Sequence, residues 1–522
     1  MDNIESSVRA MADTVLLKRQ SLGLLPFAAL IVLSAALVAI ASWLEGSGAW
    51  RHPLHWLATL DQDAAASLMS DSAQVVAGML AILITVVAIV VELSATRYTH
   101  RVTALFVRDP VSIAVMTFFL LSTVLCIWLA LVLTGEVSEA PGVPRGGFLL
   151  AMGMMTIGML ALLPYFAYVF RFVSPLGVIA RIRTEALEKV RQAQGGDPMG
   201  TKLAVIEAVE DLEDVARGAM KNHDRGIAMA AVESLATLLA DVTDLRQRLP
   251  DSWFHVDDAV ARDPDFVALA QSAVDDIARD RSWFEAKILR QYLALFGDAV
   301  GVARDVASMI AIHTRLLAER FASGQPALLE LCQRAFHSYL RAAINGTDPR
   351  TAYFVLHQYR LLGEALLAKD LEPAVLEVAH RIRFYGQLAS GSGLPFLLEV
   401  AAYDIAHLVE AAAAKPRVRD ALLTVVLTVD QERAGNLLGV RRAQVQLATF
   451  FLDRGEEASA RRIAQDLAGE RAELLAAVRA ELEREVSSSY WEINDRGSNF
   501  AFLPPERRAK LDAFFAILRE FQ

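Results

Sequence analysis

Three carboxylates stand out in a chain that otherwise contains few residue patterns associated with chemistry. Glu92 follows an uncharged run from Ala73 to Val91, whereas Asp224 and Asp348 occupy equivalent positions in an internal repeat. A carboxylate at the end of an apolar helix can bind a cation or pair with an arginine. A carboxylate at the start of a helix can bind a ligand or cap the helix. Each of the three carboxylates therefore has both a functional and a structural interpretation.

The uncharged run is about long enough to cross a bilayer as a helix, and Glu92 stands at its end. Together with Thr85 and Thr96 it is a candidate for the inner mouth of a cation pore, formed by a ring of Glu92 carboxylates from several copies of the chain. The simpler interpretation is an ion pair between Glu92 and Arg171 or Arg97.

The helical pattern continues beyond this run into a basic segment. An apolar stripe recurs at helical spacing, and it consists of Tyr98, Val102, Leu105 and Phe106. The basic side chains off this stripe are Arg97, His100, Arg101 and Arg108. The pattern predicts one helical element that connects a lipid-buried half to a basic, solvated half.

The two aspartates belong to a repeat in which residues 217–240 align with residues 341–364 without gaps. In each copy a helix ends, an aspartate follows and a new apolar stripe begins, which predicts a duplicated helical hairpin. We interpret Asp224 and Asp348 as helix caps, and Pro349 suits the first helical position. The functional alternative is that the two loops form paired sites for a ligand or an ion.

Motifs for catalysis, metals and cofactors are missing from the sequence. Gly195 to Lys202 approaches a phosphate-binding loop, but it reads Gly-Thr-Lys and stands between predicted helices where such a loop needs a preceding strand. Cys126 and Cys332 form neither a disulfide framework nor a metal site. A net charge of −10 argues against nucleic-acid binding. We expect no catalytic residue, no cofactor and no metal site, and the protein is not expected to be an enzyme.

Hydropathy places these residues in a membrane protein. A lead-in over residues 1–20 precedes four predicted spans at about 21–44, 73–92, 111–134 and 147–170, which make up a transmembrane domain over residues 21–173.

Basic residues flank the spans unequally, which predicts their orientation. One side carries Lys18, Arg19, Arg97, Arg101, Arg108, Arg171, Arg181 and Arg183. The other side carries Arg51 and Arg145. Both termini are therefore expected in the cytoplasm, and the protein is expected to be a multi-pass protein of the bacterial inner membrane.

The remaining residues, 174–522, show helical periodicity interrupted by Gly- and Pro-containing breakers. They predict a large cytoplasmic α-helical domain, and residues 441–467 resemble a single tetratricopeptide-type hairpin. The predicted fold class is thus an all-α integral membrane protein, with four transmembrane helices followed by a cytoplasmic helical domain.

Several segments resemble a family of bacterial predicted membrane proteins, domain of unknown function 2254. They are Glu92 to Ser94, Arg97 to Arg101, Phe106 to Pro110, Ala343 to Ala352 and Tyr490 to Arg507. The resemblance implies four spans and a helical cytoplasmic domain, and it brings no activity, substrate or catalytic residue.

Two hypotheses for function follow. The first is a homo-oligomeric ion channel or channel-like transport protein, in which the cytoplasmic domain senses a signal or drives assembly. The second is a membrane-anchored scaffold or regulatory protein that binds a cytoplasmic protein partner. In both, the lipid bilayer is a partner and nucleic acid is not.

Overall fold

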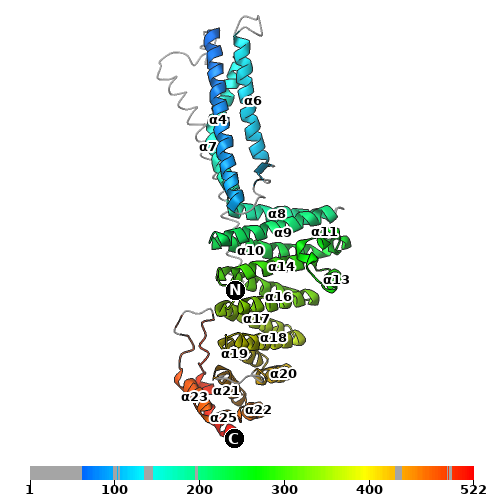
Figure 1. Cartoon of the computed structure of the whole chain (residues 1–522), viewed down its shortest axis with the longest axis vertical. Helices are drawn as coiled ribbons and strands as arrows, with labels where there is room; N and C mark the ends of the chain where they lie inside the picture. Colours follow the sequence, from blue (N-terminus) through cyan, green and yellow to red (C-terminus); the bar gives the residue numbers. More distant parts are fainter. Residues whose placement is uncertain are drawn as a thin grey trace. The chain divides into compact units, whose positions relative to one another are not determined.

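The computed structural model describes residues 61–97, 103, 106–107, 109–134, 145–193, 198–429, 438–490, 492 and 496–522 (Figure 1). Within these ranges every regular element is helical, and the sole β contact is an isolated antiparallel bridge between Ser489 and Ser498. The predicted all-α class is therefore confirmed for the part of the chain that is described. The predicted lead-in 1–20 and the first predicted span, 21–44, lie outside these residues.

Contacts divide the chain into two compact units, Met1–Val178 and Ile179–Gln522, called here the membrane unit and the repeat unit. The described helices of the membrane unit are α4 (Gln62–Arg97), α6 (Pro110–Leu133) and α7 (Arg145–Phe172), and the boundary falls within α8 (Pro175–Gln192).

Buried apolar side chains, several of them alanines, bring the helices of the membrane unit together. Ala65, Met69 and Ala73 on α4 form a buried cluster with Cys126 and Leu129 on α6. Small residues let helix backbones approach closely, which is the packing that membrane helices use in place of a hydrophobic driving force.

Asp109 determines where α6 begins. Its Oδ2 accepts a hydrogen bond from the Ser112 backbone N–H at 2.8 Å, and Pro110 occupies the first helical turn. The Tyr168 hydroxyl on α7 donates to Asp109 Oδ1 at 2.7 Å, so the same carboxylate both caps α6 and links it to α7.

Four described helices are long and apolar enough to cross a membrane, namely Gln62–Thr96, Pro110–Leu133, Leu150–Phe172 and Arg225–Arg248. In the first three only 17–22% of the apolar window is buried, and large side chains such as Ile82, Leu121 and Leu163 are exposed. That outward apolar surface suits lipid. The predicted span 73–92 falls within the first of these helices. The predicted span 111–134 overlaps the second but extends one residue past it, and 147–170 overlaps the third.

The fourth candidate, Arg225–Arg248, was not predicted as a span. It contains α10 (Arg225–Leu245) of the repeat unit, and 56% of its apolar window is buried. Its apolar side chains are largely covered by neighbouring helices, which explains its composition as that of a core helix.

The other helices of the repeat unit are α9 (Pro198–Lys221), η3 (Arg246–Arg248), η4 (Asp251–Phe254), α11 (Asp258–Ala261), α12 (Pro264–Val267), α13 (Gln271–Arg279), α14 (Trp283–Ala299), α15 (Arg304–Phe321), α16 (Pro326–Asn345), α17 (Pro349–Ala368), α18 (Glu372–Gly391), α19 (Phe396–Ala411), α20 (Pro416–Leu427), α21 (Leu438–Asp453), α22 (Glu457–Leu467), α23 (Ala472–Arg484), α24 (Pro505–Arg508) and α25 (Leu511–Arg519).

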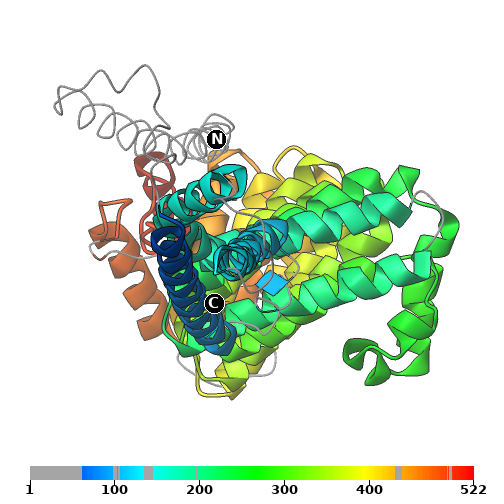
Figure 2. The same ribbon diagram turned by 90° about the horizontal axis from the view of Figure 1, so that it is seen from above.

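These helices stack as antiparallel hairpins in two rows. The front row consists of α10, α15, α17, α19 and α21, each packed on the next, and the back row consists of α9, α14, α16, α18 and α20. Seen from above in Figure 2, successive helices of this stack, coloured green to yellow, overlie one another. Each hairpin contacts mainly its neighbours, which is the organisation of an α-solenoid.

One backbone link recurs between the helices. His223 and Thr347 adopt left-handed φ values of 58° and 52°, and the next residues, Asp224 and Asp348, donate their N–H to the carbonyl oxygens five residues back. Leu371 and Glu456 make the same bond after Asp370 and Gly455. This is the Schellman ending, which satisfies the last carbonyl groups of a helix and turns the chain into the next one. The two sequence repeats therefore share one link geometry, and the α21–α22 hairpin continues the array.

Candidate functional site

Glu92 lies on α4 with an exposed side chain. It borders an apolar cleft of about 500 Å³ that Thr96, Phe106 and Met116 also line. Arg171, one of its two proposed partners, donates from Nε to the Ala167 carbonyl oxygen on its own helix at 3.2 Å.

The threonines grouped with Glu92 are hydrogen-bonded within α4. Thr85 Oγ1 donates to the Ala81 carbonyl oxygen at 2.8 Å, and Thr96 Oγ1 donates to that of Leu93 at 3.0 Å. Apolar helices commonly accommodate hydroxyl groups in this way, so the geometry by itself does not favour a pore.

The basic segment that follows is only partly described. Arg97 belongs to α4, but its side chain lies outside the described part of the structure, as do His100, Arg101 and Arg108 entirely.

Both repeat aspartates are helix caps in the structure. Asp224 Oδ1 accepts a hydrogen bond from the Ile227 N–H at 3.2 Å, and Asp348 Oδ1 accepts one from the Thr351 N–H at 3.1 Å. Helix capping therefore explains the presence of both carboxylates. A polar cavity of about 340 Å³ is nevertheless lined by Arg225 from the first link and by Arg350 from the second.

Asp348 makes more contacts than Asp224 does. Its Oδ2 accepts hydrogen bonds from the Thr351 hydroxyl at 2.7 Å, the Gly301 N–H at 3.0 Å and the Arg304 Nε–H at 3.2 Å. Burial raises the pKa of Asp348, but these hydrogen bonds outweigh it and hold the pKa below its ordinary value. The carboxylate is 2% exposed, so it stabilises the junction of α15 and α17 and is closed to a ligand.

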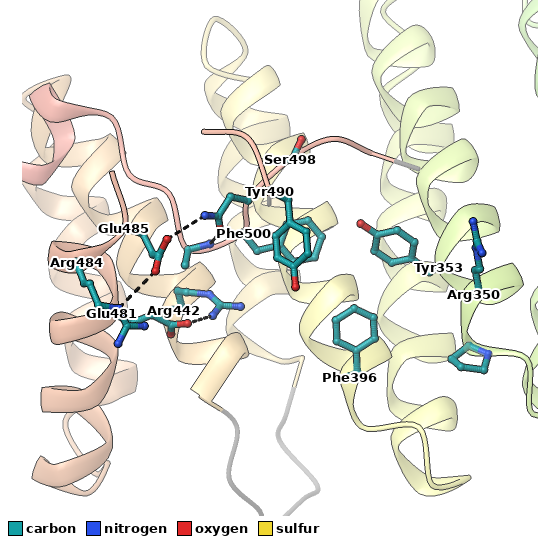
Figure 3. Close-up of a pocket in the computed structure, with 13 residues that line it drawn as sticks. Arg350, Tyr353, Phe396, Arg442, Glu481, Arg484, Glu485, Tyr490, Ser498 and Phe500 are labelled. Carbon is teal, nitrogen blue, oxygen red and sulfur yellow. Dashed lines mark hydrogen bonds and ion pairs between the residues drawn. The ribbon is translucent and has the colours of Figure 1, made fainter. Parts of the chain in front are cut away.

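A second cavity, of about 560 Å³, lies between the front row and the C-terminal segment (Figure 3). Tyr353 of α17 and Phe396 of α19 face Tyr490 and Phe500 of the segment that follows α23. Charged side chains stand at its edges, and Arg350 lies beyond Tyr353. On the opposite side Arg442 pairs with Glu481 at 2.8 Å, and Arg484 pairs with Glu485 at 3.4 Å. A volume in the range of about 300–1,000 Å³ with apolar walls and few polar groups is typical of a binding site.

Arg496 attaches the C-terminal segment beside this cavity. Its guanidinium contacts Asp404 of α19 through Nη1–Oδ1 at 2.5 Å and Nη2–Oδ2 at 3.1 Å. Nη2 also donates to the Tyr353 carbonyl oxygen at 2.9 Å, and the guanidinium carbon lies 4.2 Å from the centre of the Tyr353 ring. Bidentate pairing and stacking together are interactions that arginine makes and lysine does not.

The segment after Arg496 turns at Phe500 and Ala501, and α21 holds its backbone carbonyl groups. The Gln446 amide on α21 donates to the carbonyl oxygens of Phe500 and Phe502, both at 3.0 Å. The Phe500 ring stacks on that of Tyr403, with centroids 4.0 Å apart. Figure 1 shows this part of the chain beside the lower helices of the stack. The front row thus binds a non-helical stretch of polypeptide through side-chain amide, aromatic and charged contacts.

Sequence reasoning did not identify this site. The stretch Tyr490 to Arg507 resembles a family in sequence, but no pattern in it predicts a role. A sequence feature that could have revealed the site is the presence of Gly, Pro and aromatic residues without helical periodicity after the last long helix. Such a segment forms no helix of its own and must pack against other elements.

Among the described residues, no group of three or more His, Cys, Asp or Glu side chains converges as metal ligands would. Isolated histidines are instead embedded between helices: burial, followed by nearby arginines, lowers the pKa of His357 to about 4. His337 Nε2 lies 2.9 Å from the Tyr359 hydroxyl, and burial lowers its pKa also to about 4.

No curated protein and no solved structure matches the chain. The motifs at residues 343–352 and 490–507 lie outside the one stretch that a family comparison covers. Over that stretch the resemblance drawn from the sequence is confirmed: residues 19–223 match the family described as predicted membrane protein (DUF2254).

Proposed function

We propose that the protein is a membrane-anchored scaffold or regulatory protein whose repeat unit binds a non-helical segment of a partner protein in the bacterial cytoplasm. One observation carries this proposal. The front row already holds a non-helical segment of its own chain through Gln446 and Asp404, and an aromatic-lined cavity opens beside that segment. The proposed role is binding without catalysis.

The walls of the cavity indicate the chemistry of the partner. Tyr353, Phe396 and Phe500 offer flat apolar surfaces to an aromatic or large apolar side chain. Phe396 is 50% exposed, although aromatic residues are usually buried, and such a side chain in a pocket is a typical anchor point of an interface.

The cytoplasmic location follows from the excess of Lys and Arg on one side of the predicted spans. Fusing a reporter enzyme that is active only in the cytoplasm to Gln522 tests it, because the reporter is inactive if the C-terminus is outside.

Site-specific photocrosslinking tests the docking proposal. A photoreactive phenylalanine analogue is placed at Phe396 of the full chain, and in a control at Phe384, which is 42% exposed on α18 and does not line the cavity. We expect one discrete adduct at position 396 that is absent at position 384. Sequencing of the crosslinked peptide should give one segment that carries an aromatic or large apolar residue. Equal labelling at both positions, or none at either, contradicts the proposal.

A second candidate function is an ion-conducting homo-oligomer, favoured by the exposed Glu92 carboxylate beside the cleft on α4. A ring of such carboxylates selects cations by charge. Cation flux through reconstituted protein is expected to fall strongly with Glu92→Lys and to be unchanged by Glu188→Lys, a matched reversal on the exposed face of α8. Equal flux in both variants argues against a pore at Glu92.

A further inference from the structure

Asp109, which caps α6 in the membrane unit, is a buried carboxylate without a cationic partner. The residue is 9% exposed, and no ion pair joins it to any residue that the structure describes. Its Oδ1 accepts a hydrogen bond from the Tyr168 hydroxyl at 2.7 Å, and its Oδ2 accepts one from the Ser112 N–H at 2.8 Å. An ionised carboxylate only accepts hydrogen bonds, which is the pattern seen here. A charge buried in this way needs a compensating positive charge.

Two buried hydroxyl groups beside this carboxylate lack hydrogen-bond partners. Ser112 on α6 is 2% exposed and Tyr165 on α7 is 3% exposed. The Tyr165 hydroxyl lies close to the Ser112 hydroxyl and to the Asp109 carboxylate, but neither hydroxyl makes a hydrogen bond within the described part of the chain. Buried polar groups are nearly always paired, so two unpaired hydroxyls at one place indicate a bound polar species.

Aromatic rings cover this cluster at the end of the two apolar helices. The Tyr165 ring stacks on that of Tyr168 with centroids 6.3 Å apart, and the Phe172 ring lies 6.0 Å from that of Tyr168. Phe106, which is 6% exposed, packs edge-on against Phe172 at 5.5 Å. Such walls exclude bulk water and strengthen the electrostatic interactions of the carboxylate.

We propose that Asp109, Ser112 and Tyr165 bind one alkali-metal cation between α6 and α7. Carboxylate and hydroxyl oxygens are hard ligands that suit such an ion. The single carboxylate balances a single positive charge, whereas Ca²⁺ usually collects several carboxylate or carbonyl oxygens and Mg²⁺ keeps several of its own water molecules. The cation pairs all three side chains and fastens the start of α6 to α7. This site is independent of the proposed docking function.

Thermal unfolding of the full-length protein in detergent tests the proposal. Midpoints are compared in NaCl, KCl and choline chloride at one ionic strength, because choline is too large for the site. A cation that binds only the folded state raises the midpoint as its concentration rises. We expect Na⁺ or K⁺ to do so and choline not to. Equilibrium binding of radioactive sodium, or of radioactive rubidium as a substitute for potassium, should saturate at one ion per chain.

Asp109→Asn removes the negative charge and keeps an oxygen that can cap α6, since Asn and Asp are equally good at this position. We expect this variant to lose both the ion binding and the salt-specific shift of the midpoint. Asp71→Asn is the matched control, because Asp71 is exposed on α4. It should keep both properties.

Ser112→Ala and Tyr165→Phe test the hydroxyl ligands. Each should weaken cation binding by about tenfold, as expected for the loss of one contact to a charged group. In choline chloride the same substitutions should leave the midpoint unchanged or raise it, because each removes a buried hydroxyl without a partner. Ser122→Ala is the control: Ser122 is 1% exposed on the same helix, but its hydroxyl donates to the Phe118 carbonyl oxygen at 2.8 Å. It should not alter cation binding.

Equal midpoints in the three salts, together with no binding of either radioactive ion, would overturn the proposal and assign the hydroxyls to a water molecule. Binding that persists in Asp109→Asn would overturn it as well, because the cation would then lie elsewhere. If Asp109→Asn does not fold, Tyr165→Phe decides, since it keeps the stacked ring. Cation binding as tight as in the unmodified protein would contradict the site, and so would stabilisation by Ca²⁺ or Mg²⁺ alone.

Discussion

Arg496 and Asp404, which are 92 residues apart in the chain, form a two-point ion pair whose side chains are 2% and 0% exposed. Arg360 Nε lies 3.2 Å from the same Asp404 Oδ1, so one buried carboxylate is shared by two arginines. Burying these charges costs solvation free energy, and only complete pairing offsets that cost. The pair therefore determines the position of the C-terminal segment on α19, and with it one wall of the aromatic cavity.

The two partners of this pair should differ in their effect on stability. Asp404→Asn removes the buried carboxylate that Arg496 contacts at two points, whereas Arg360 keeps its pair with Glu364, and we expect a loss of about 3–5 kcal/mol in the free energy of unfolding. Arg496→Met leaves Asp404 paired with Arg360 and should cost less, while it releases the C-terminal segment. Chemical denaturation measures the first effect, and protease cleavage between residues 485 and 503 measures the second.

Arg484→Met is the control for this comparison, since Arg484 is 73% exposed at the end of α23. It should change neither the denaturation midpoint nor the cleavage pattern. A larger loss in Arg496→Met than in Asp404→Asn would contradict the shared-carboxylate description.

The two equivalent repeat aspartates should also be unequal. Asp224 caps its helix with one hydrogen bond at 3.2 Å, so Asp224→Ala should cost about 1 kcal/mol. Asp348→Ala also removes acceptors from Gly301 and Arg304 and should cost about 2–3 kcal/mol. Equal losses in parallel urea titrations would show that the additional bonds of Asp348 contribute nothing.

A structural feature can be predicted from the sequence when the residues that determine it lie close together in the chain. The link at Asp348 was predictable because an aspartate, a proline and the apolar stripe after them lie within one short stretch. The left-handed residue was not, because it is Thr347 and not the preceding Gly346. Thr347 accepts the strained conformation since the Schellman hydrogen bonds on both sides of it are satisfied.

Long-range relationships were beyond the sequence for a physical reason. Helical periodicity shows that Arg496 follows the last long helix, but it does not show which of many carboxylates it meets. The composition of α10 likewise permits a membrane span, and only packing against its neighbours shows that its apolar side chains are covered. Cavities such as the one at Arg350 arise between elements and leave no pattern within any one of them.

Close packing of α18 on α19 depends on Gly386. A Cβ atom at this position would lie 2.6 Å from the Ala401 Cβ, which is closer than two carbon atoms can approach. We expect Gly386→Ala to separate the two helices and cost about 1–3 kcal/mol. Gly297→Ala in α14 is the matched substitution, because nothing lies within 4 Å of its added Cβ. It should stabilise by about 0.5–1 kcal/mol through helix propensity, and a loss comparable to that of Gly386→Ala would refute the packing argument.

Glu213 on α9 should make the stability of the repeat unit depend on pH. Burial is the main cause that raises the pKa of Glu213 to about 7. Arg217 lowers this pKa, whereas the nearby negative charges of Asp214, Asp298 and Asp265 raise it further. A raised carboxyl pKa means that the folded state holds the proton more tightly than the unfolded state does. The resulting stabilisation is complete below the ordinary pKa of 4.5 and is lost as the pH rises through about 7. Between pH 6 and pH 8 this group should remove about 1.4 kcal/mol from the free energy of unfolding.

Glu213→Gln, which keeps the shape and stays neutral, should abolish that part of the pH dependence of stability, whereas Glu207→Gln on the exposed face of the same helix should preserve it. Denaturation midpoints of the three proteins at the two pH values measure the effect, and an unchanged pH slope in Glu213→Gln would assign the dependence to other groups.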